Sequence, residues 1–300
     1  NLQRLRRLKI KNFNINIENY KYLKKLPRFN LIIDCCAEPA IEASKKIPDR
    51  VFNTNLVGTF NILKKCKNDS AHIIFLSSSR VYSIEDLKSL IGKAIILKPL
   101  SKKKKIDTKF ETSEPSSLYG FTKLASEKLI KEFFYMTKLK YIINRFGVIA
   151  GPWQFGKQDQ GFFSLWVAKH FFKKKLSYIG FGGKGYQIRD VIHIDDVCKI
   201  ILIQIKKIHK KNNLTFNIGG GLKNSISLKE LTKKCQNISK NRIKISGISK
   251  TSMYDIPYYV TDNRKVTKIY NWKPSKTIDH IINDIYKWLN QNKNVWKYFK

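Results

Sequence analysis

The chain of 300 residues is long enough for one large domain or two smaller ones, and 42% of its residues are hydrophobic, which supports a sizeable core. No apolar run reaches the roughly 18 residues of a membrane helix, so we expect a cytoplasmic protein without a signal peptide or membrane contact. The net charge of +37 comes from lysines scattered over the whole length. This distribution favours a compositional bias and attraction for anionic ligands over a specific nucleic-acid partner.

The cysteine pattern argues against both a disulfide framework and a metal centre. The five cysteines form no C-x-x-C pair and no cluster with metal-ligand spacing: Cys35, Cys36, Cys66, Cys198 and Cys235. We therefore expect buried free thiols in a reducing compartment and no bound metal.

Strand and helix patterns alternate in the first half of the chain. Continuous apolar runs predict buried parallel strands at residues 30–36, 72–76 and 141–146. Helices are predicted at residues 51–65 and 118–137, and a polar surface loop at residues 84–116, which includes the run of lysines at 102–105. This order predicts an α/β fold with a parallel sheet covered on both faces.

The character of the chain changes after Gly151-Pro152, where loops, short strands and aromatic residues dominate. We predict helices at residues 162–173, 195–209, 227–239 and 279–290. Residues 1–150 are interpreted as a dinucleotide-binding domain. Residues 151–300 are interpreted mainly as a smaller substrate lobe, with some segments returning to the first domain.

Tyr119 and Lys123 have the spacing of a catalytic pair. Four residues apart on a predicted helix, both side chains point from one face. The ammonium group is expected to stabilise the phenolate and to lower the tyrosine pKa from about 10, which would make it a general acid or base. Because Tyr-x-x-x-Lys often occurs by chance, the serines that end the strand before it, Ser78 and Ser79, add weight to this interpretation.

Residues 180–185, GFGGKG, match the dinucleotide fingerprint G-x-G-x-x-G by letter. A strand rather than a helix is predicted to follow, at residues 186–194, and no acidic residue ends a strand about 20 positions later. We therefore interpret the segment as a glycine turn between two strands.

Six segments together resemble the extended short-chain dehydrogenase/reductase family, specifically its NAD-dependent nucleotide-sugar epimerases and dehydratases, and most of all its CDP-paratose 2-epimerase-like members. They are SSSRVYS at 77–83, SLYGFTKLASE at 117–127, GVIAGPWQFGK at 147–157, QIRDVIHIDD at 187–196, TFNIGGG at 215–221 and YYVTDNRK at 258–265. The resemblance covers essentially the whole chain. It implies a Rossmann-type, doubly wound sheet, NAD as cofactor and a nucleotide-sugar substrate.

The resemblance assigns catalytic roles to Tyr119, Lys123 and Ser78, with Ser79 as the neighbouring alternative to Ser78. Tyr119 and Lys123 are also implied in cofactor binding. The acidic pair that dehydratases carry after the catalytic serine or threonine is replaced by Ser79 and Arg80, which argues against dehydration.

The remaining implied contacts concern the cofactor and the substrate. Ala37 and Asn55 match positions beside the dinucleotide, although Asn55 is equally well explained as a helix residue that bonds a neighbouring strand. Arg189, with Gln154 and Asp255, is implied in substrate binding, because the planar guanidinium binds phosphate oxygens in pairs. The alternative for Arg189 is a surface ion pair with its neighbour, Asp190.

The resemblance also predicts that the sequence lacks the family's N-terminal glycine-rich loop, about 40 to 50 residues with the acidic residue that binds the adenosine ribose. We expect NAD-dependent epimerisation of a nucleotide-linked sugar, such as a CDP-deoxyhexose at C2, by transient oxidation and re-reduction in a homodimer. Two alternatives are a truncated, non-catalytic relative that acts as a binding protein and a basic nucleic-acid-binding protein.

Overall fold

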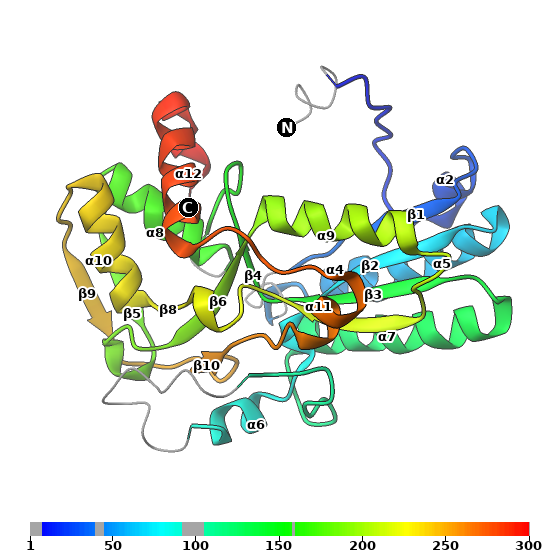
Figure 1. The fold of residues 1–300 in the computed structure, drawn as a ribbon, viewed down its shortest axis with the longest axis horizontal. Coiled ribbons are helices and arrows are strands. Elements are labelled where there is room, and N and C mark those ends of the chain that lie inside the picture. Colours follow the sequence, from blue (N-terminus) through cyan, green and yellow to red (C-terminus); the bar gives the residue numbers. More distant parts are fainter. Residues whose placement is uncertain (1–7, 40–44, 92–104, 158–159, 300) are drawn as a thin grey trace.

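A computed structural model describes residues 8–39, 45–91, 105–157 and 160–299 of the chain. Its central sheet has four parallel strands in the order β1-β2-β3-β7 (Figure 1). Their bounds are β1 Leu31–Asp34, β2 His72–Ser78, β3 Tyr141–Phe146 and β7 Leu214–Ile218. The three strands predicted in the first half of the chain are confirmed, and the fourth comes from the second half.

Alternating side chains of β2 explain why both faces of this sheet are covered. Ile73 and Phe75 pack into one core with residues of helices α5 (Gly58–Asp69) and α7 (Leu118–Thr137). Ile74 packs into another core with residues of helices α9 (Ile194–Lys207) and α11 (Arg264–Tyr270). Because successive residues of a strand point to opposite faces, an uninterrupted apolar run requires a helical layer on each side. The sequence prediction of a doubly covered parallel sheet is confirmed.

The first helical layer contains α4 Pro48–Phe52, a π-helical turn Asn53–Val57, α5 Gly58–Asp69 and α7 Leu118–Thr137. Helix α7 has the predicted bounds, and the Ser117 hydroxyl caps its first turn by accepting the Gly120 N–H. The opposite layer contains α9 Ile194–Lys207 and α11 Arg264–Tyr270, and Figure 1 shows α9 and α7 on opposite sides of the sheet.

A further core joins helices α8 Phe162–Phe171, α10 Leu228–Ser239 and α12 Ile278–Gln291, which Figure 1 shows grouped at one end of the molecule. The strands β10 Tyr258–Tyr259, β6 Ile188–His193 and β4 Val148–Ala150 pair in that order, and β8 Ser225–Ser227 pairs antiparallel with β6. A separate parallel pair is formed by β5 Leu176–Ile179 and β9 Ile245–Ile248.

The remaining described elements are short: α2 Tyr20–Lys24, α6 Ile84–Ser89 and the 3-10 turns Ser79–Val81, Phe181–Gly183, Leu222–Asn224 and Lys293–Tyr298. Helix α6 corrects the prediction of a loop from residue 84 onward. It forms because the Ser83 hydroxyl caps its N-terminus and because Ile84 and Leu87 are buried in a small core. Residues 92–104, with most of the lysine run, lie outside the described residues.

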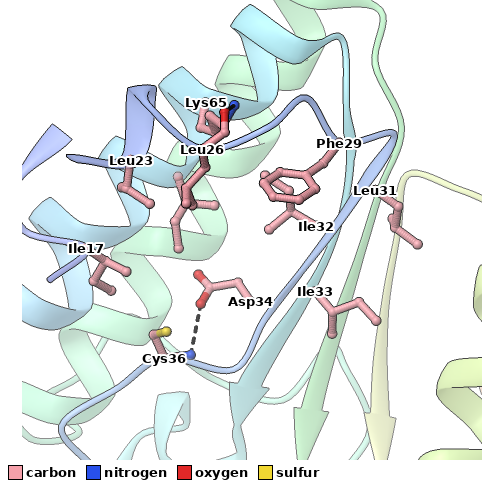
Figure 2. Close-up of a pocket in the computed structure, with 11 residues that line it drawn as sticks. Ile17, Leu23, Leu26, Phe29, Leu31, Ile32, Ile33, Asp34, Cys36 and Lys65 are labelled. Atoms are coloured by element: carbon pink, nitrogen blue, oxygen red, sulfur yellow. Dashed lines mark hydrogen bonds between the residues drawn. The ribbon is translucent and has the colours of Figure 1, made fainter. Parts of the chain in front are cut away.

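Strand β1 is the edge of the central sheet as described, and this corrects the prediction that it is fully buried. Ile33 is 38% exposed, since the described strands pair with β1 on one side only. A cavity of about 290 Å³ lies beside the strand, lined by apolar side chains together with Asp34 and Lys65 (Figure 2). The Asp34 carboxylate accepts the Cys36 N–H within it, at 2.9 Å.

All five cysteines are free, as predicted, but only Cys66 and Cys235 are buried. The prediction of buried thiols is wrong for Cys35, Cys36 and Cys198, which are exposed. None of the helices in the described ranges is both long enough and apolar enough to cross a bilayer.

Candidate functional site

A cavity of about 1210 Å³ opens where β2 and β3 end, which is the edge at which parallel α/β sheets bind their ligands. Seven of the eight residues that the sequence singles out line it: Ala37, Ser78, Tyr119, Lys123, Gln154, Arg189 and Asp255. Ser79, the alternative to Ser78, lines the cavity as well. The structure therefore brings together side chains that lie more than 200 positions apart in the chain.

Ser78 and Tyr119 share a hydrogen bond at this cavity. Ser78 is the last residue of β2, and its hydroxyl also accepts the Arg80 N–H at 3.1 Å, which begins the 3-10 turn at residues 79–81. The turn packs against the start of α7: a Cβ atom at Gly120 would lie 2.1 Å from the Arg80 carbonyl oxygen. Glycine at this position lets the helix bring Tyr119 up to the strand end.

The ionisation of Tyr119 differs from the sequence prediction. Burial raises the pKa of the phenol, while the hydrogen bond with Ser78 and the charge of Arg80 act in the opposite direction. The prediction that Lys123 lowers the pKa of Tyr119 is wrong in this structure, where Arg80 is the cation that acts on the phenol. Burial of the phenol thus favours its protonated form.

Lys123 is only 2% exposed. Its Nζ atom lies 3.9 Å from the centre of the Phe75 ring, and within the described residues it has no hydrogen-bond or ion-pair partner. Burial lowers the pKa of the ammonium, and the charges of Asp34 and Glu127 oppose that shift. A buried cation without an oxygen ligand, at the wall of a cavity, is suited to binding hydroxyl groups of a ligand.

Asn55 lies behind the cavity rather than in its wall. Its Oδ1 accepts the Glu38 N–H at 2.7 Å, and its Nδ2 donates to the Glu38 carbonyl and to the Thr122 hydroxyl. Asn55 therefore ties the segment that follows β1 to helix α7 and holds Ala37 at the cavity. Since both amide atoms already have partners, this geometry favours the interpretation of Asn55 as a residue that bonds neighbouring segments.

Arg189 pairs with Asp255 and not with its neighbour. The Nη2 atom lies 3.6 Å from the Asp255 carboxylate and also donates to the Ile256 carbonyl, while Nη1 donates to the Ile188 carbonyl at 2.8 Å. The alternative of an ion pair with Asp190 is wrong, because that carboxylate faces away and accepts the Gly221 N–H at 2.8 Å. Burial lowers the pKa of Arg189 to about 10 and raises that of Asp190 to about 6.

Gln154 lines the cavity, but its amide group is bonded within the protein. Its Nε2 donates to the Ile149 carbonyl at 2.9 Å, and its Oε1 accepts the Ser164 hydroxyl at 2.5 Å. These bonds fix the start of α8 to the segment after β4. Any contact of Gln154 with a ligand must therefore replace or share one of them.

Sequence reasoning assigned no role to Glu127 or Arg80. The buried Glu127 accepts hydrogen bonds from Ser77, at 2.5 Å, and from Nε and Nη2 of Arg145, at 3.0 and 2.7 Å. This cluster locks α7 to the ends of β2 and β3. The sequence signal for Glu127 is its position four residues after Lys123, and that for Arg80 is a cation directly after the strand-end serines.

The segment Gly180–Gly185 forms a turn between β5 and β6, as predicted. Gly180, Gly182, Gly183 and Gly185 have φ values between 67° and 76°, and strand β6 follows rather than a helix. Its geometry does not present N–H groups at a helix N-terminus, so its rejection as a dinucleotide fingerprint is confirmed.

Comparison with known proteins agrees with this geometry. The model of the NAD dependent epimerase/dehydratase family matches residues 2–219. A CDP-paratose 2-epimerase from Salmonella typhi is 26% identical over 83% of this chain and 74% of its own length. A UDP-glucuronate 4-epimerase from Thermodesulfobacterium geofontis is 25% identical over 96% of this chain and 82% of its own length.

Solved structures show the same fold. A UDP-glucose 4-epimerase from Thermus thermophilus, in complex with NAD, has a TM-score of 0.79 and 15% identity over 95% of this chain and 86% of its own. MoeE5 in complex with UDP-glucuronic acid and NAD has a TM-score of 0.74 and 19% identity over 93% and 83% of the two chains. The fold is thus Rossmann-type, and the chain belongs to the NAD-dependent epimerase/dehydratase family.

The residues present fit one end of NAD. Lys123 is a buried cation without an oxygen ligand in the described residues, Tyr119 lies one helical turn away, and Ala37 lines the same cavity. Such a wall suits the ribose and nicotinamide. In the described ranges no glycine-rich turn joins a strand to a following α-helix, the arrangement that would suit the pyrophosphate.

Proposed function

We propose that this protein epimerises a nucleotide-linked sugar by transient oxidation and re-reduction of one ring carbon. The observation that carries the proposal is the hydrogen-bonded pair Ser78–Tyr119, which lies with the buried Lys123 at the wall of one cavity. The finer expectation, a CDP-deoxyhexose that reacts at C2, is supported by the similarity to CDP-paratose 2-epimerase. Membership of the family supports NAD as the cofactor.

In this proposal each side chain has a separate task. The chemistry that bound NAD supplies is the reversible acceptance of a hydride. Tyr119, as phenolate, removes the proton of the reacting hydroxyl, and Ser78 holds that hydroxyl by a hydrogen bond. Lys123 binds ribose hydroxyls and adds its positive charge to the site. Tyr119 returns the proton after the keto sugar has turned its other face to the hydride donor.

Arg189, with its partner Asp255, is proposed to bind the nucleotide diphosphate, because a guanidinium fits phosphate oxygens in pairs. Gln154 is proposed to orient the sugar. In this proposal residues 1–150 form the cofactor domain and residues 151–300 mainly the substrate lobe. The reaction is proposed to take place in the cytoplasm.

The first test is the Tyr119→Phe variant, assayed by NMR for interconversion of CDP- and UDP-linked sugars in the presence of NAD. Loss of the acid–base group is expected to lower kcat by about 10²- to 10⁴-fold. The matched control is Tyr135→Phe, since Tyr135 is 87% exposed on the same helix. Unchanged turnover in Tyr119→Phe would contradict the mechanism, and nucleotide-sugar binding without turnover in the wild type would favour the non-catalytic alternative.

We also propose a homodimer through α5 and α7. Phe60 and Phe121, on these two packed helices, are exposed, and exposed aromatic side chains on a helical face are typical of a protein interface. In analytical ultracentrifugation we expect the wild type to sediment as a dimer and the double variant Phe60→Glu, Phe121→Glu to sediment as a monomer. A monomeric wild type at micromolar concentration contradicts this proposal.

A further inference from the structure

Arg80 adjoins Ser78 and Tyr119, the pair at which the reacting hydroxyl is proposed to bind. Its N–H donates to the Ser78 hydroxyl, and its carbonyl oxygen lies against Gly120, the residue after Tyr119. Its side chain lines the same cavity as both groups, and its charge acts on the phenol. The short turn after β2 and the start of α7 thus hold one guanidinium beside the hydroxyl–phenol pair.

The guanidinium of Arg80 is only partly occupied by the protein. Nη1 donates to the Tyr254 carbonyl at 3.1 Å, which accounts for one of its five N–H donors within the described residues. The neighbouring carboxylate, Asp255, pairs with Arg189 at 3.6 Å and acts on Arg80 through its charge. Two guanidinium groups therefore share one carboxylate, and this end of the cavity is left with a net positive charge.

The position of that charge restricts the substrate. If a hydroxyl reacts at Tyr119, its own carbon lies at the phenol, and a group on a neighbouring ring carbon is within reach of the adjoining Arg80. A nucleotide sugar carries an anionic group on a carbon next to the reacting one in two cases. If C2 reacts, the neighbour C1 bears the phosphate, and if C4 of a hexuronic acid reacts, the neighbour C5 bears the carboxylate. A neutral hexose that reacts at C4 has no such group.

We propose that Arg80 is a substrate-selecting residue, which binds an anionic group attached to the ring carbon next to the one that is oxidised. This inference rests on the proposed function and adds the substrate class: nucleotide sugars that react at C2, or nucleotide-linked hexuronic acids that react at C4. A charge-assisted, forked hydrogen bond in a half-buried site discriminates strongly against a neutral group, which leaves the guanidinium without its acceptor.

The experiment compares wild type, Arg80→Gln and the control Arg242→Gln, whose arginine is exposed far along the chain. The probes are CDP-paratose, UDP-glucuronic acid and UDP-glucose, with kcat/KM measured by NMR and Kd by calorimetry. Circular dichroism and a thermal unfolding curve establish that each variant is folded. The conservative variant Arg80→Lys keeps the charge and loses the planar guanidinium, and it is expected to retain more kcat/KM for the charged substrates than Arg80→Gln does.

We expect wild type to prefer an anion-adjacent substrate over UDP-glucose, and Arg80→Gln to lower kcat/KM for that substrate about 10- to 100-fold while UDP-glucose changes less than about threefold. A selective loss for UDP-glucuronic acid identifies the carboxylate as the ligand. A selective loss for CDP-paratose identifies the phosphate. Arg242→Gln is expected to behave as wild type.

Two results would overturn the inference. One is an equal loss for all three compounds, which would mean that Arg80 acts only on Tyr119 through its charge. The other is a wild type that handles UDP-glucose as well as it handles the charged substrates. If no compound is turned over, the proposed function fails, and the calorimetric preference of wild type over Arg80→Gln still decides whether Arg80 selects the anion.

Discussion

Two buried lysines on neighbouring helices have opposite surroundings. Lys65, on α5, is 3% exposed, and its ammonium donates to the carbonyls of Leu26 and Pro27 and pairs with Asp69 at 2.7 Å. Lys123, on α7, is 2% exposed and, in the described ranges, touches the Phe75 ring instead of an oxygen atom. Burial is almost equal, yet only one of the two charges is compensated.

The difference shows how a structural cation can be distinguished from a functional one. Removing an ammonium from water is costly, and only oxygen partners offset that cost. Lys65 has three such partners, and it fastens the segment before β1 to the first helical layer. For Lys123, the cost of desolvation is offset in part by the charges of Asp34 and Glu127, which form no ion pair with it in the described residues. Lys123 also lines the cavity of about 1210 Å³. Its compensation is expected from a bound ligand.

The largest expected effect follows from the replacement of Lys65. Lys65→Met removes the partner of a buried carboxylate, because among the residues that the structure describes Asp69 is left with the Phe29 N–H alone. We expect the free energy of unfolding to fall by about 3–5 kcal/mol. The measurement is the midpoint of urea unfolding. Lys67→Met, an exposed lysine of the same helix, serves as control and should change stability by less than about 0.5 kcal/mol.

If Lys65→Met proves as stable as Lys67→Met, the interpretation of Lys65 as a stabilising cation is contradicted. The result would mean that solvent reaches the Lys65–Asp69 pair. Urea unfolding of the double variant Lys65→Met, Asp69→Leu checks this point. Replacing both charges by apolar groups should recover much of the loss, as is found for buried ion pairs in general.

Lys123→Met is expected to have the opposite profile. The free energy of unfolding at pH 7 should not fall, since the substitution removes a desolvated charge without stranding a bonded partner. Turnover should fall by about 10²- to 10³-fold, the usual loss when a preorganised electrostatic group of an active site is removed. Urea unfolding and the NMR assay measure the two effects. A strong loss of stability would contradict the functional interpretation of Lys123.

The smallest expected effect is a pH dependence of the difference in stability between Lys123→Met and wild type. The folded-state pKa of Lys123 lies below its ordinary value of 10.5. Between these two values the unfolded chain binds the proton and the folded protein releases it, so the stability of the wild type rises with pH. The stability advantage of Lys123→Met over wild type should therefore shrink as pH increases toward 10.5. Urea midpoints at several alkaline pH values measure it, and a constant difference would count against the lowered pKa.

Local patterns predicted much of the fold. The apolar runs identified β2 and β3, and the helix from Leu118 to Thr137 has the predicted bounds because its periodicity and its Ser117 cap are local features. The prediction failed where partners decide the outcome. Strand β1 is half-exposed because the described sheet ends there, and α6 forms because it packs against residues from distant parts of the chain.

The candidate site shows the same division. The spacing of Tyr119 and Lys123 guarantees a common helix face, and the cavity does collect both side chains. The spacing of Tyr119 and Lys123 could not predict which cation acts on the phenol. The cation that acts on the phenol is Arg80, held in place by the Tyr254 carbonyl 174 positions away. Arg189 pairs with Asp255 rather than with the adjacent Asp190, because neighbours on a strand point to opposite faces.

The sequence by itself determined the succession of strands and helices, the shared face of the tyrosine and the lysine, and the family. These properties depend on residues a few positions apart, whose relative geometry the backbone dictates. Only the tertiary structure decided which cation acts on the phenol and which buried lysine has oxygen partners. It also decided where the cavity carries a net positive charge. Burial and electrostatic pairing depend on groups brought together from the whole chain, and no local pattern contains that information.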